Sequence, residues 1–321
     1  MKVSRAWAVL ALASIASVPL GACAGGKATQ TYKEYRDALA KATKVEEVLP
    51  FLAKESRARV EKAPEDQRSR VLAIIKLSSE EILDLTVVKE AKTETGVRLE
   101  VRGITGSGED ATGTVDIVRE EGAFRVGKED WTPAPRTAAS AKDCDKYAAD
   151  LKSSSAVTRA RAAGAIADPN AVLHTTCLAA VPTLVDALAD PVEGIRRNAG
   201  LALRSLLYDA AGKDPNAVAP FKSVFPRLVA AKETAAKAGE LIAEMNLQFA
   251  VAAFGSDAIP VLVKDLSHKE RELRLGAAQL LGNLGPAAKS ALPEVKAAAA
   301  AEQDELTRET LARAEKAIQG G

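Results

Sequence analysis

The chain of 321 residues carries 44 Lys and Arg against 43 Asp and Glu, so it is long enough for two domains and lacks the excess of positive charge that nucleic-acid binding requires. With only two histidines, His174 and His268, the composition also argues against a histidine-based metal site. No phosphate-binding loop, nucleophile elbow, HExxH or paired CxxC motif occurs, so the sequence predicts neither a cofactor nor an enzyme.

The first 22 residues predict an export signal. Lys2 and Arg5 precede an apolar run at 6–18, and small residues follow it up to Ala22. The run is too short to span roughly 30 Å of hydrocarbon, so we expect a cleaved signal peptide and not a membrane helix.

Residues 20–23, Leu-Gly-Ala-Cys, resemble the lipobox of bacterial lipoproteins. This resemblance implies that Cys23 becomes the N-terminal residue, carries acyl chains such as palmitate, and holds the protein to a lipid bilayer. Ala24 follows the cysteine and no Asp stands there, which resembles the pattern of outer-membrane lipoproteins that face the periplasm in Gram-negative cells. The alternative is an ordinary cleaved signal with a chance cysteine at this place.

Two further cysteines, Cys144 and Cys177, remain if Cys23 is acylated. An even remainder in an exported protein favours a disulfide between them. Two buried free thiols are the alternative, because cysteine also packs as a small hydrophobe.

Residues 23–30 are small and polar and predict a tether, after which helices are expected up to about Ser78. Apolar residues recur at helical spacing from Tyr32 onward. Thr43 followed by Glu46 matches a capping box for a second helix, and Pro64 is placed to open a third.

The hydrophobic period then changes to two, which predicts four strands. Alternating segments lie at 84–87, 97–102, 115–117 and 124–126, with glycines between them. Strands with one apolar face form an antiparallel sheet that needs a cover, and the preceding helices supply it. The N-terminal half is therefore predicted to be an α+β domain at 31–133.

This half resembles the nuclear-transport-factor-like α+β cone in the small version attached to bacterial lipoproteins, through its element order and its ending at 121–126, Glu-Gly-Ala-Phe-Arg-Val. Some members of that superfamily enclose a small-molecule pocket, and a few are isomerases or dehydratases that use a carboxylate or a tyrosine. The local candidates for such chemistry are Asp84, Asp116, Tyr32 and Tyr35. The alternative is that the aspartates face water and the tyrosines belong to the core.

Residues 134–141 predict a linker, and 142–319 predict helical repeats. The segment at 180–184 matches 258–262, and the register then holds downstream without a gap. Each matching segment places a proline in the first turn of a helix. The four equivalent prolines are Pro182, Pro226, Pro260 and Pro293. A repeating unit of two helices follows from this spacing.

The repeats resemble HEAT repeats of the short type found in phycobilisome-lyase-like proteins. The resemblance depends on the first-turn proline, the apolar ridge after it, and an arginine on the second helix at Arg159, Arg196 and Arg274. It implies an all-α solenoid in which Asp190 and these arginines either form a charge ladder between repeats or line the exposed surface.

The ladder is expected to be interrupted. Ser153 and His268 occupy the places that correspond to Asp190, and the second helix after Pro226 lacks the arginine.

In the aligned register, Cys144 and Cys177 fall near adjacent first helices, so a bridge would join the first repeat to the second.

Solenoids present extended surfaces and mostly recognise proteins. We therefore expect a non-enzymatic scaffold at the cell envelope that binds another envelope protein through its helical repeats. The alternative is small-molecule binding, or isomerase- or dehydratase-like activity, in the N-terminal domain. A chromophore lyase, which the repeat type alone suggests, has no bilin site in the sequence to support it.

Overall fold

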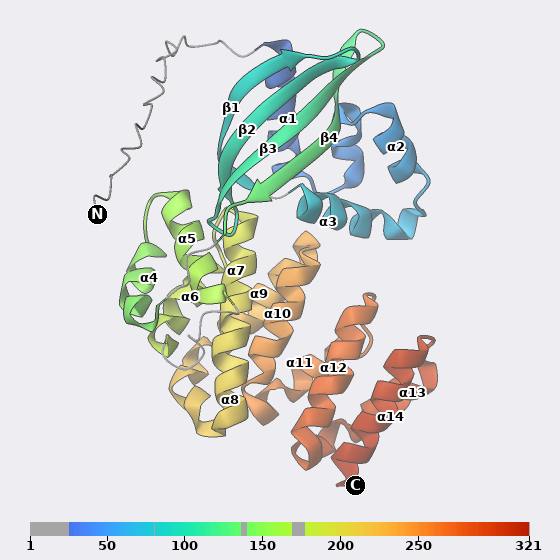
Figure 1. Cartoon of the computed structure of the whole chain (residues 1–321). Coiled ribbons are helices and arrows are strands. Elements are labelled where there is room, and N and C mark those ends of the chain that lie inside the picture. The colour runs from blue at the N-terminus through green and yellow to red at the C-terminus, as the bar shows by residue number, and fades with distance from the viewer. Residues whose placement is uncertain (1–25, 80, 136–139, 169–176, 321) are drawn as a thin grey trace, which may run out of the picture.

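A computed structural model describes residues 26–79, 81–135, 140–168 and 177–320 (Figure 1). The expected signal peptide, Cys23 and His174 lie outside these ranges. Two units follow one another along the described chain: a curved sheet with its helices, and then a helical unit. Within the described ranges, no helix combines the length and the apolar character needed to cross a membrane.

The first unit begins with three helices. They are α1 (Lys27–Lys41), α2 (Lys54–Glu61) and α3 (Arg68–Ser78). Because α1 begins at Lys27, the last part of the expected tether is helical. The expected second helix is instead a pair of 3₁₀ turns at Val45–Glu47 and Leu49–Phe51. Pro50 is the middle residue of the second turn, and its lack of an N–H group prevents a continuous helix. The capping residue is Glu47 and not Glu46, since the Thr43 N–H donates to Glu47 Oε2 at 3.0 Å.

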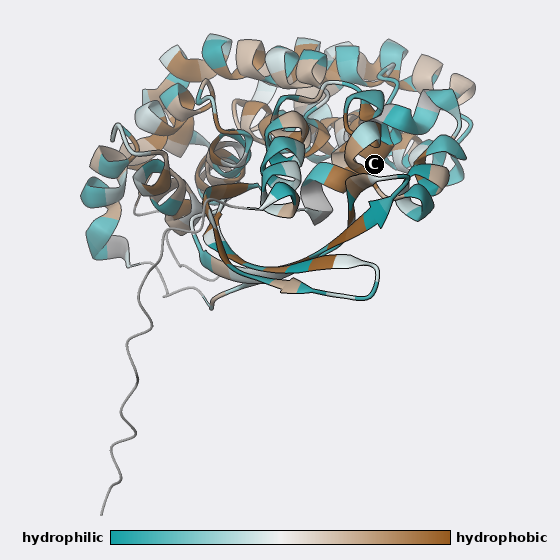
Figure 2. Ribbon diagram, turned by 90° about the horizontal axis from the view of Figure 1, so that it is seen from above, coloured by the Kyte–Doolittle hydropathy of each residue, from teal (hydrophilic) through white to brown (hydrophobic). Residues whose placement is uncertain are grey.

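The sheet is antiparallel, with its strands in the order of the chain. The strands are β1 (Ile82–Lys92), β2 (Gly96–Thr105), β3 (Asp110–Glu120) and β4 (Ala123–Pro133). The expected alternation is confirmed, because Leu99 and Val115 are fully buried whereas Arg98 and Glu100 are exposed. The sheet curves around helices that lie on one side of it (Figure 2), and Tyr32 of α1 is buried against its inner face.

The helical unit consists of helix pairs. The pairs are α4 (Cys144–Asp150) with α5 (Ala156–Ala167), α6 (Val181–Ala187) with α7 (Glu193–Leu203), α9 (Phe225–Ala238) with α10 (Leu241–Ala252), α11 (Ile259–Asp265) with α12 (Arg271–Leu284), and α13 (Leu292–Ala301) with α14 (Glu305–Gln319). Between α7 and α9 lie a π-helical turn (Arg204–Tyr208), the short helix α8 (Asp209–Lys213) and a 3₁₀ stretch (Pro215–Val224). The four prolines named above stand in the first turn of α6, α9, α11 and α13, as expected. The second helices contact one another in chain order, from α5 through α7, α10 and α12 to α14.

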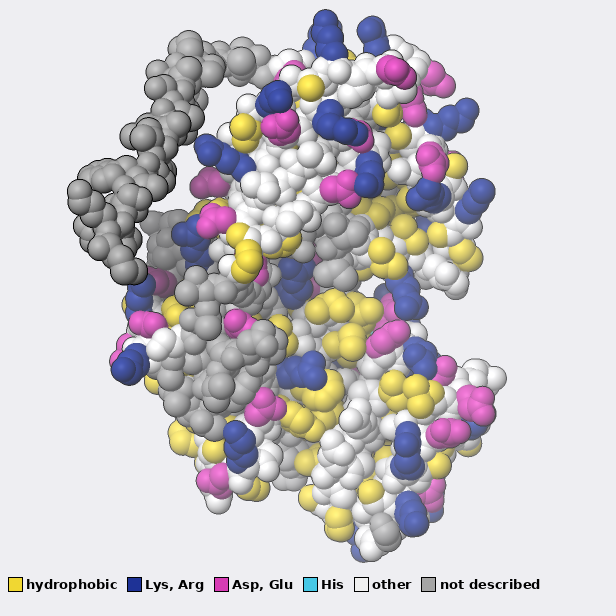
Figure 3. Space-filling model, in the orientation of Figure 1, with side chains coloured by type: hydrophobic (Ala, Val, Ile, Leu, Met, Phe, Trp, Pro, Cys, Tyr) yellow, Lys and Arg dark blue, Asp and Glu magenta, His cyan; other side chains and the backbone are white. Residues whose placement is uncertain are grey.

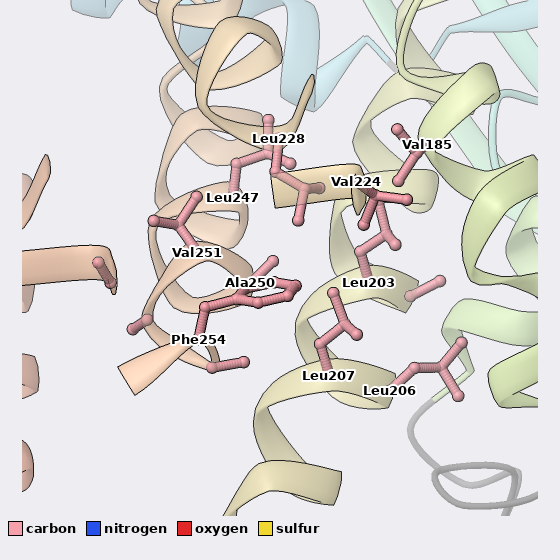
Figure 4. Close-up of a cluster of buried hydrophobic side chains, with 14 of the residues drawn as sticks. Val185, Leu203, Leu206, Leu207, Val224, Leu228, Leu247, Ala250, Val251 and Phe254 are labelled. Carbon is pink, nitrogen blue, oxygen red and sulfur yellow. The ribbon is translucent and has the colours of Figure 1, made fainter. Parts of the chain in front are cut away.

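One apolar core runs through the helical unit. Figure 4 shows its middle, where Leu203 and Leu207 from α7 and the turn after it meet Leu228, Leu247 and Phe254 from the next pair. Each pair has an apolar face that only a neighbouring pair covers, so the pairs depend on one another for stability.

The two units meet at the turn between β2 and β3. Gly106 of this turn lies against Gly194 at the start of α7, and Asn198 Nδ2 donates to the Gly106 carbonyl oxygen at 3.2 Å. A Cβ atom added to Gly164 on α5 would overlap the carbonyl oxygen of Ser107. Glycine at position 164 therefore allows the turn to reach the helix backbone.

We expect Gly164→Ala to lower the free energy of unfolding by about 1–3 kcal/mol, because the new methyl group forces the turn away from α5. Gly200→Ala is the matched control: a Cβ at Gly200 would lie 3.7 Å from its nearest neighbour, the Asn246 side chain, which is ordinary contact. That substitution should be neutral or stabilise the protein by up to about 1 kcal/mol. Denaturant unfolding and limited proteolysis of both variants test this, and equal effects would contradict it.

Candidate functional site

The three arginines that mark the repeats lie near the starts of α5, α7 and α12 and make the same backbone contacts. Nη1 of Arg159 donates to the carbonyl oxygens of Ser153 and Ser154 at 2.9 and 3.1 Å. Arg196 bonds the carbonyls of Asp190 and Pro191 in the same way, and Arg274 those of His268 and Lys269. Each arginine therefore binds the backbone carbonyl of the residue six positions before it. Because this contact does not involve that residue's side chain, serine or histidine can stand there as well as aspartate.

The remaining guanidinium nitrogens pair with a carboxylate of the following helix pair. Nε of Arg159 lies 2.5 Å from Asp190 Oδ2, and Nε of Arg274 lies 2.7 Å from Glu302 Oε2. Arg196 pairs with Glu240. The side chains of Arg159, Arg196 and Arg274 are only 15%, 23% and 21% exposed. They connect neighbouring helix pairs, so an exposed binding surface would have to consist of other residues.

A buried ionic cluster occupies the junction between α10 and α12, where the sequence has no ladder arginine. Lys232 Nζ lies 2.7 Å from Asp265 Oδ1 and 3.2 Å from Glu244 Oε1, and each of the three side chains is 6% exposed or less. Gln248 Nε2 donates to Asp265 Oδ2 at 2.8 Å. His268 Nε2 lies 3.5 Å from Glu244 Oε1. Lys232 lies on α9 and pairs with Glu244 of its own helix pair and with Asp265 of the next one. It therefore connects two neighbouring pairs, as the arginines do elsewhere.

Cys144 and Cys177 form a disulfide in the structure, with Cα atoms 5.3 Å apart. This separation lies within the range of about 4.4–6.8 Å that a disulfide bridge needs. Cys144 begins α4, and Cys177 precedes α6, so the bridge connects the first helix pair to the second.

The candidate residues of the N-terminal unit do not come together. Asp84 is exposed on β1, and Asp116 pairs with Arg98 at 2.6 Å on the outer face of the sheet. Tyr32 and Tyr35 are buried on the inner face, 0% and 2% exposed. Burial raises the pKa of Tyr35 to about 12. The tyrosines thus contribute to the core and lie apart from both aspartates.

Sequence reasoning missed Glu129, which shares the inner face with Tyr32. It accepts hydrogen bonds from the Tyr32 hydroxyl, from Arg36 Nη1 at 2.7 Å and from Trp131 Nε1 at 3.1 Å. An irregularity in the β3–β4 register at Gly127 turns the following residues of β4 over, so Glu129 faces inward opposite Val115. Simple alternation from Val126 would have placed it outside.

Sequence reasoning also missed a group of side chains from the π-helical turn after α7, from α10 and from α12, which we call the aromatic patch: Arg204, Tyr208, Phe249 and Asn283. The first three are partly buried and Asn283 is exposed. The Arg204 guanidinium carbon lies 4.3 Å from the centre of the Phe249 ring, and the Tyr208 ring meets that ring edge-on at 5.4 Å. Asn283 Nδ2 donates to the Tyr208 hydroxyl at 3.0 Å.

The π-helical turn Arg204–Tyr208 explains how the patch is built. Short π-helical segments are rare and frequently mark functional sites, and this one carries both Arg204 and Tyr208. Arginine and tyrosine are also enriched among the residues that dominate protein–protein binding energies. A π turn has no signature in a single sequence, which is why the patch was not predicted.

Glu81, immediately before β1, connects the two units because its carboxylate accepts hydrogen bonds from backbone N–H groups at the start of α7. Its carboxylate bonds the N–H of Glu193 at 3.2 Å and the N–H of Gly194. Burial raises the pKa of Glu81, and the hydrogen bond from Gly194 offsets part of this effect.

A raised pKa means that folded Glu81 holds its proton more tightly than unfolded Glu81. Its contribution to stability is therefore full below the usual glutamate pKa and is lost as the pH rises through the folded value. In denaturant titrations we expect the free energy of unfolding of the wild type, relative to Glu81→Gln, to increase as the pH falls through the raised pKa of folded Glu81 toward the usual glutamate value.

Glu302 provides a control of opposite sign, because its hydrogen bond to Arg274 lowers its pKa. The advantage of the wild type over Glu302→Gln should fall as the pH falls. The same slope for both variants would contradict the assignment.

No protein-family model and no curated protein sequence matches this chain. Among the described residues, no group of three or more His, Cys, Asp and Glu side chains is arranged to hold a metal ion. Its function is therefore inferred from its own surfaces and contacts.

Proposed function

We propose that this protein is an exported lipoprotein, acylated at Cys23, that binds another envelope protein through its helical unit without catalysis. In a Gram-negative cell it would lie at the outer membrane and face the periplasm. The lipobox-like residues 20–23 support the anchoring part of this proposal. Labelled palmitate should appear on the wild type and be absent from Cys23→Ser.

The proposal includes a HEAT-like solenoid for the helical unit and a nuclear-transport-factor-like fold for the first unit. The prolines at the starts of first helices and the chain-order contacts of the second helices support the former. An arginine that connects one pair to the next also supports it. The curved antiparallel sheet that covers α1 supports the latter.

The aromatic patch carries the functional part of the proposal. Aromatic residues make up only 4% of the chain, yet Tyr208 and Phe249 meet here beside Arg204, where both rings are partly buried against the core and partly exposed. The three side chains already hold one another in place, so a partner that covers them costs little additional conformational entropy. The alternative of small-molecule chemistry in the first unit has weaker support, because Tyr32 has no exposed surface.

A photoreactive amino acid at Gln279 tests the proposal in intact envelopes. Gln279 is exposed on α12, one helical turn from Asn283, so it lies beside the patch. We expect one discrete crosslinked protein, and we expect Tyr208→Ala to reduce its yield at least tenfold, as loss of a central tyrosine does at protein interfaces.

Tyr147→Ala is the matched control, since Tyr147 is a half-buried tyrosine on α4 outside the patch. It should leave the crosslink unchanged. A crosslink that is insensitive to Tyr208→Ala, or equally sensitive to Tyr147→Ala, would contradict docking at the aromatic patch.

A further inference from the structure

A cavity of about 350 Å³ lies in the seam between the two units, where α3 faces the start of α10. Figure 3 shows hydrophobic side chains gathered where the surface is hollowed between the upper and lower units. Ile74 of α3 and Ile242 of α10 line this cavity, and they are 56% and 44% exposed. They are two of the four large hydrophobic side chains exposed among the described residues. One lies on each unit, so the seam has an apolar wall on both sides that the protein itself does not cover.

The charged side chains around this cavity form internal pairs, with one exception. The pairs are Lys76 with Glu193 at 3.1 Å, Arg70 with Glu272 at 3.6 Å, and Arg196 with Glu240. Arg197 of α7 also lines the cavity, and no carboxylate of the described chain lies within ion-pair distance of it. Its positive charge helps to lower the pKa of Glu81, whose carboxylate accepts hydrogen bonds from the backbone N–H groups of Glu193 and Gly194. The cavity therefore combines apolar walls with a half-buried arginine that forms no ion pair within the described chain and has Glu81 as a more distant negative neighbour.

Arg197 also lines a second hollow of about 480 Å³, between α1, β1 and α7. The guanidinium thus lies where the two hollows meet and is reached from both. A group bound to it would contact both units of the protein.

We propose that the seam cavity binds a small organic anion with an apolar tail, of the class of medium-chain carboxylates. The tail would lie between Ile74 and Ile242, and the carboxylate would pair with Arg197. A volume of this size falls within the range of about 300–1,000 Å³ typical of small-molecule sites. A guanidinium matches a carboxylate through two parallel hydrogen bonds, whereas a neutral or cationic amphiphile would leave Arg197 without a partner. The site lies apart from the aromatic patch and does not depend on a protein partner.

The test uses the full chain, purified in a neutral sugar detergent, and a photoreactive octanoate that carries a diazirine near the end of its tail. We expect labelled peptides from α3 and α10, and competition by octanoate but not by octanol. Arg197→Gln should weaken labelling at least tenfold, roughly what the loss of a charge-assisted hydrogen bond produces. Arg197→Lys, which keeps the charge but loses the two parallel hydrogen bonds, should recover part of the labelling.

Val88→Ser is the matched control, because Val88 is 60% exposed on β1 and lies outside the cavity. It should leave labelling unchanged, whereas Ile242→Ser should reduce it. Thermal unfolding of each variant confirms that the fold is retained. Labelling that survives Arg197→Gln in a folded protein, or that octanol blocks as well as octanoate does, would overturn the proposal.

Discussion

Lys232→Ala should lower the free energy of unfolding by about 3–5 kcal/mol, which is the range for breaking a buried ion pair on one side. The lysine is the cation between Glu244 and Asp265, and both carboxylates are 4% exposed. Without it, two negative charges face each other in the core of the helical unit, where water does not compensate them. Denaturant unfolding at neutral pH measures the loss.

Two further variants separate charge from packing at this cluster. Lys264→Ala removes an exposed lysine that pairs with Glu233 at the surface, and it should change stability little. Combining Lys232→Met with Glu244→Gln and Asp265→Asn removes all three charges and should recover much of the loss, because neutral side chains cost less to bury than unpaired ions. A triple variant as unstable as Lys232→Ala would show that side-chain packing, and not charge, determines the stability of this cluster.

Breaking the bridge between Cys144 and Cys177 should cost about 3–4 kcal/mol. The bridge spans a sequence separation of 33 residues, and closing a loop of that length restricts the unfolded chain by this amount in the chain-entropy estimate. A variant with serine at both positions should unfold at lower denaturant concentration than the oxidised wild type.

Reductant serves as the internal control for the bridge. It should shift the unfolding midpoint of the wild type toward that of the double-serine variant and leave the variant unchanged. Alkylation of both thiols in unreduced protein would contradict the disulfide directly.

The sequence predicted what depends on local pattern. Period-two alternation located the strands, and first-turn prolines located the starts of α6, α9, α11 and α13, because both signals act within a few residues. Arg159, Arg196 and Arg274 were recognised in the same way. Their carboxylate partners were not all predicted, since they stand 31, 44 and 28 residues away and follow no fixed spacing.

What the sequence did not predict arises from changes of register and from contacts between the units. One irregularity at Gly127 reverses the faces of β4 and brings Glu129 inside. One extra residue per turn at Arg204–Tyr208 places the aromatic patch. The contact of Gly164 with the turn at Ser107 could not be predicted either, because that turn belongs to the other unit.

The position of Gly26, the first described residue, indicates which end of the protein would lie closest to a bilayer if Cys23 were acylated. Gly26 donates its N–H to Glu90 Oε1 at 3.1 Å, near the end of the sheet opposite the turn that holds the helical unit (Figure 1). In the sequence, only Ala24 and Gly25 separate it from Cys23. If Cys23 is acylated, the lipid would be attached at this end of the sheet, and strands of about ten residues, roughly 30 Å long, would lie between it and the helical unit. The aromatic patch would then stand clear of the lipid headgroups, within reach of partners whose domains project well beyond the membrane surface.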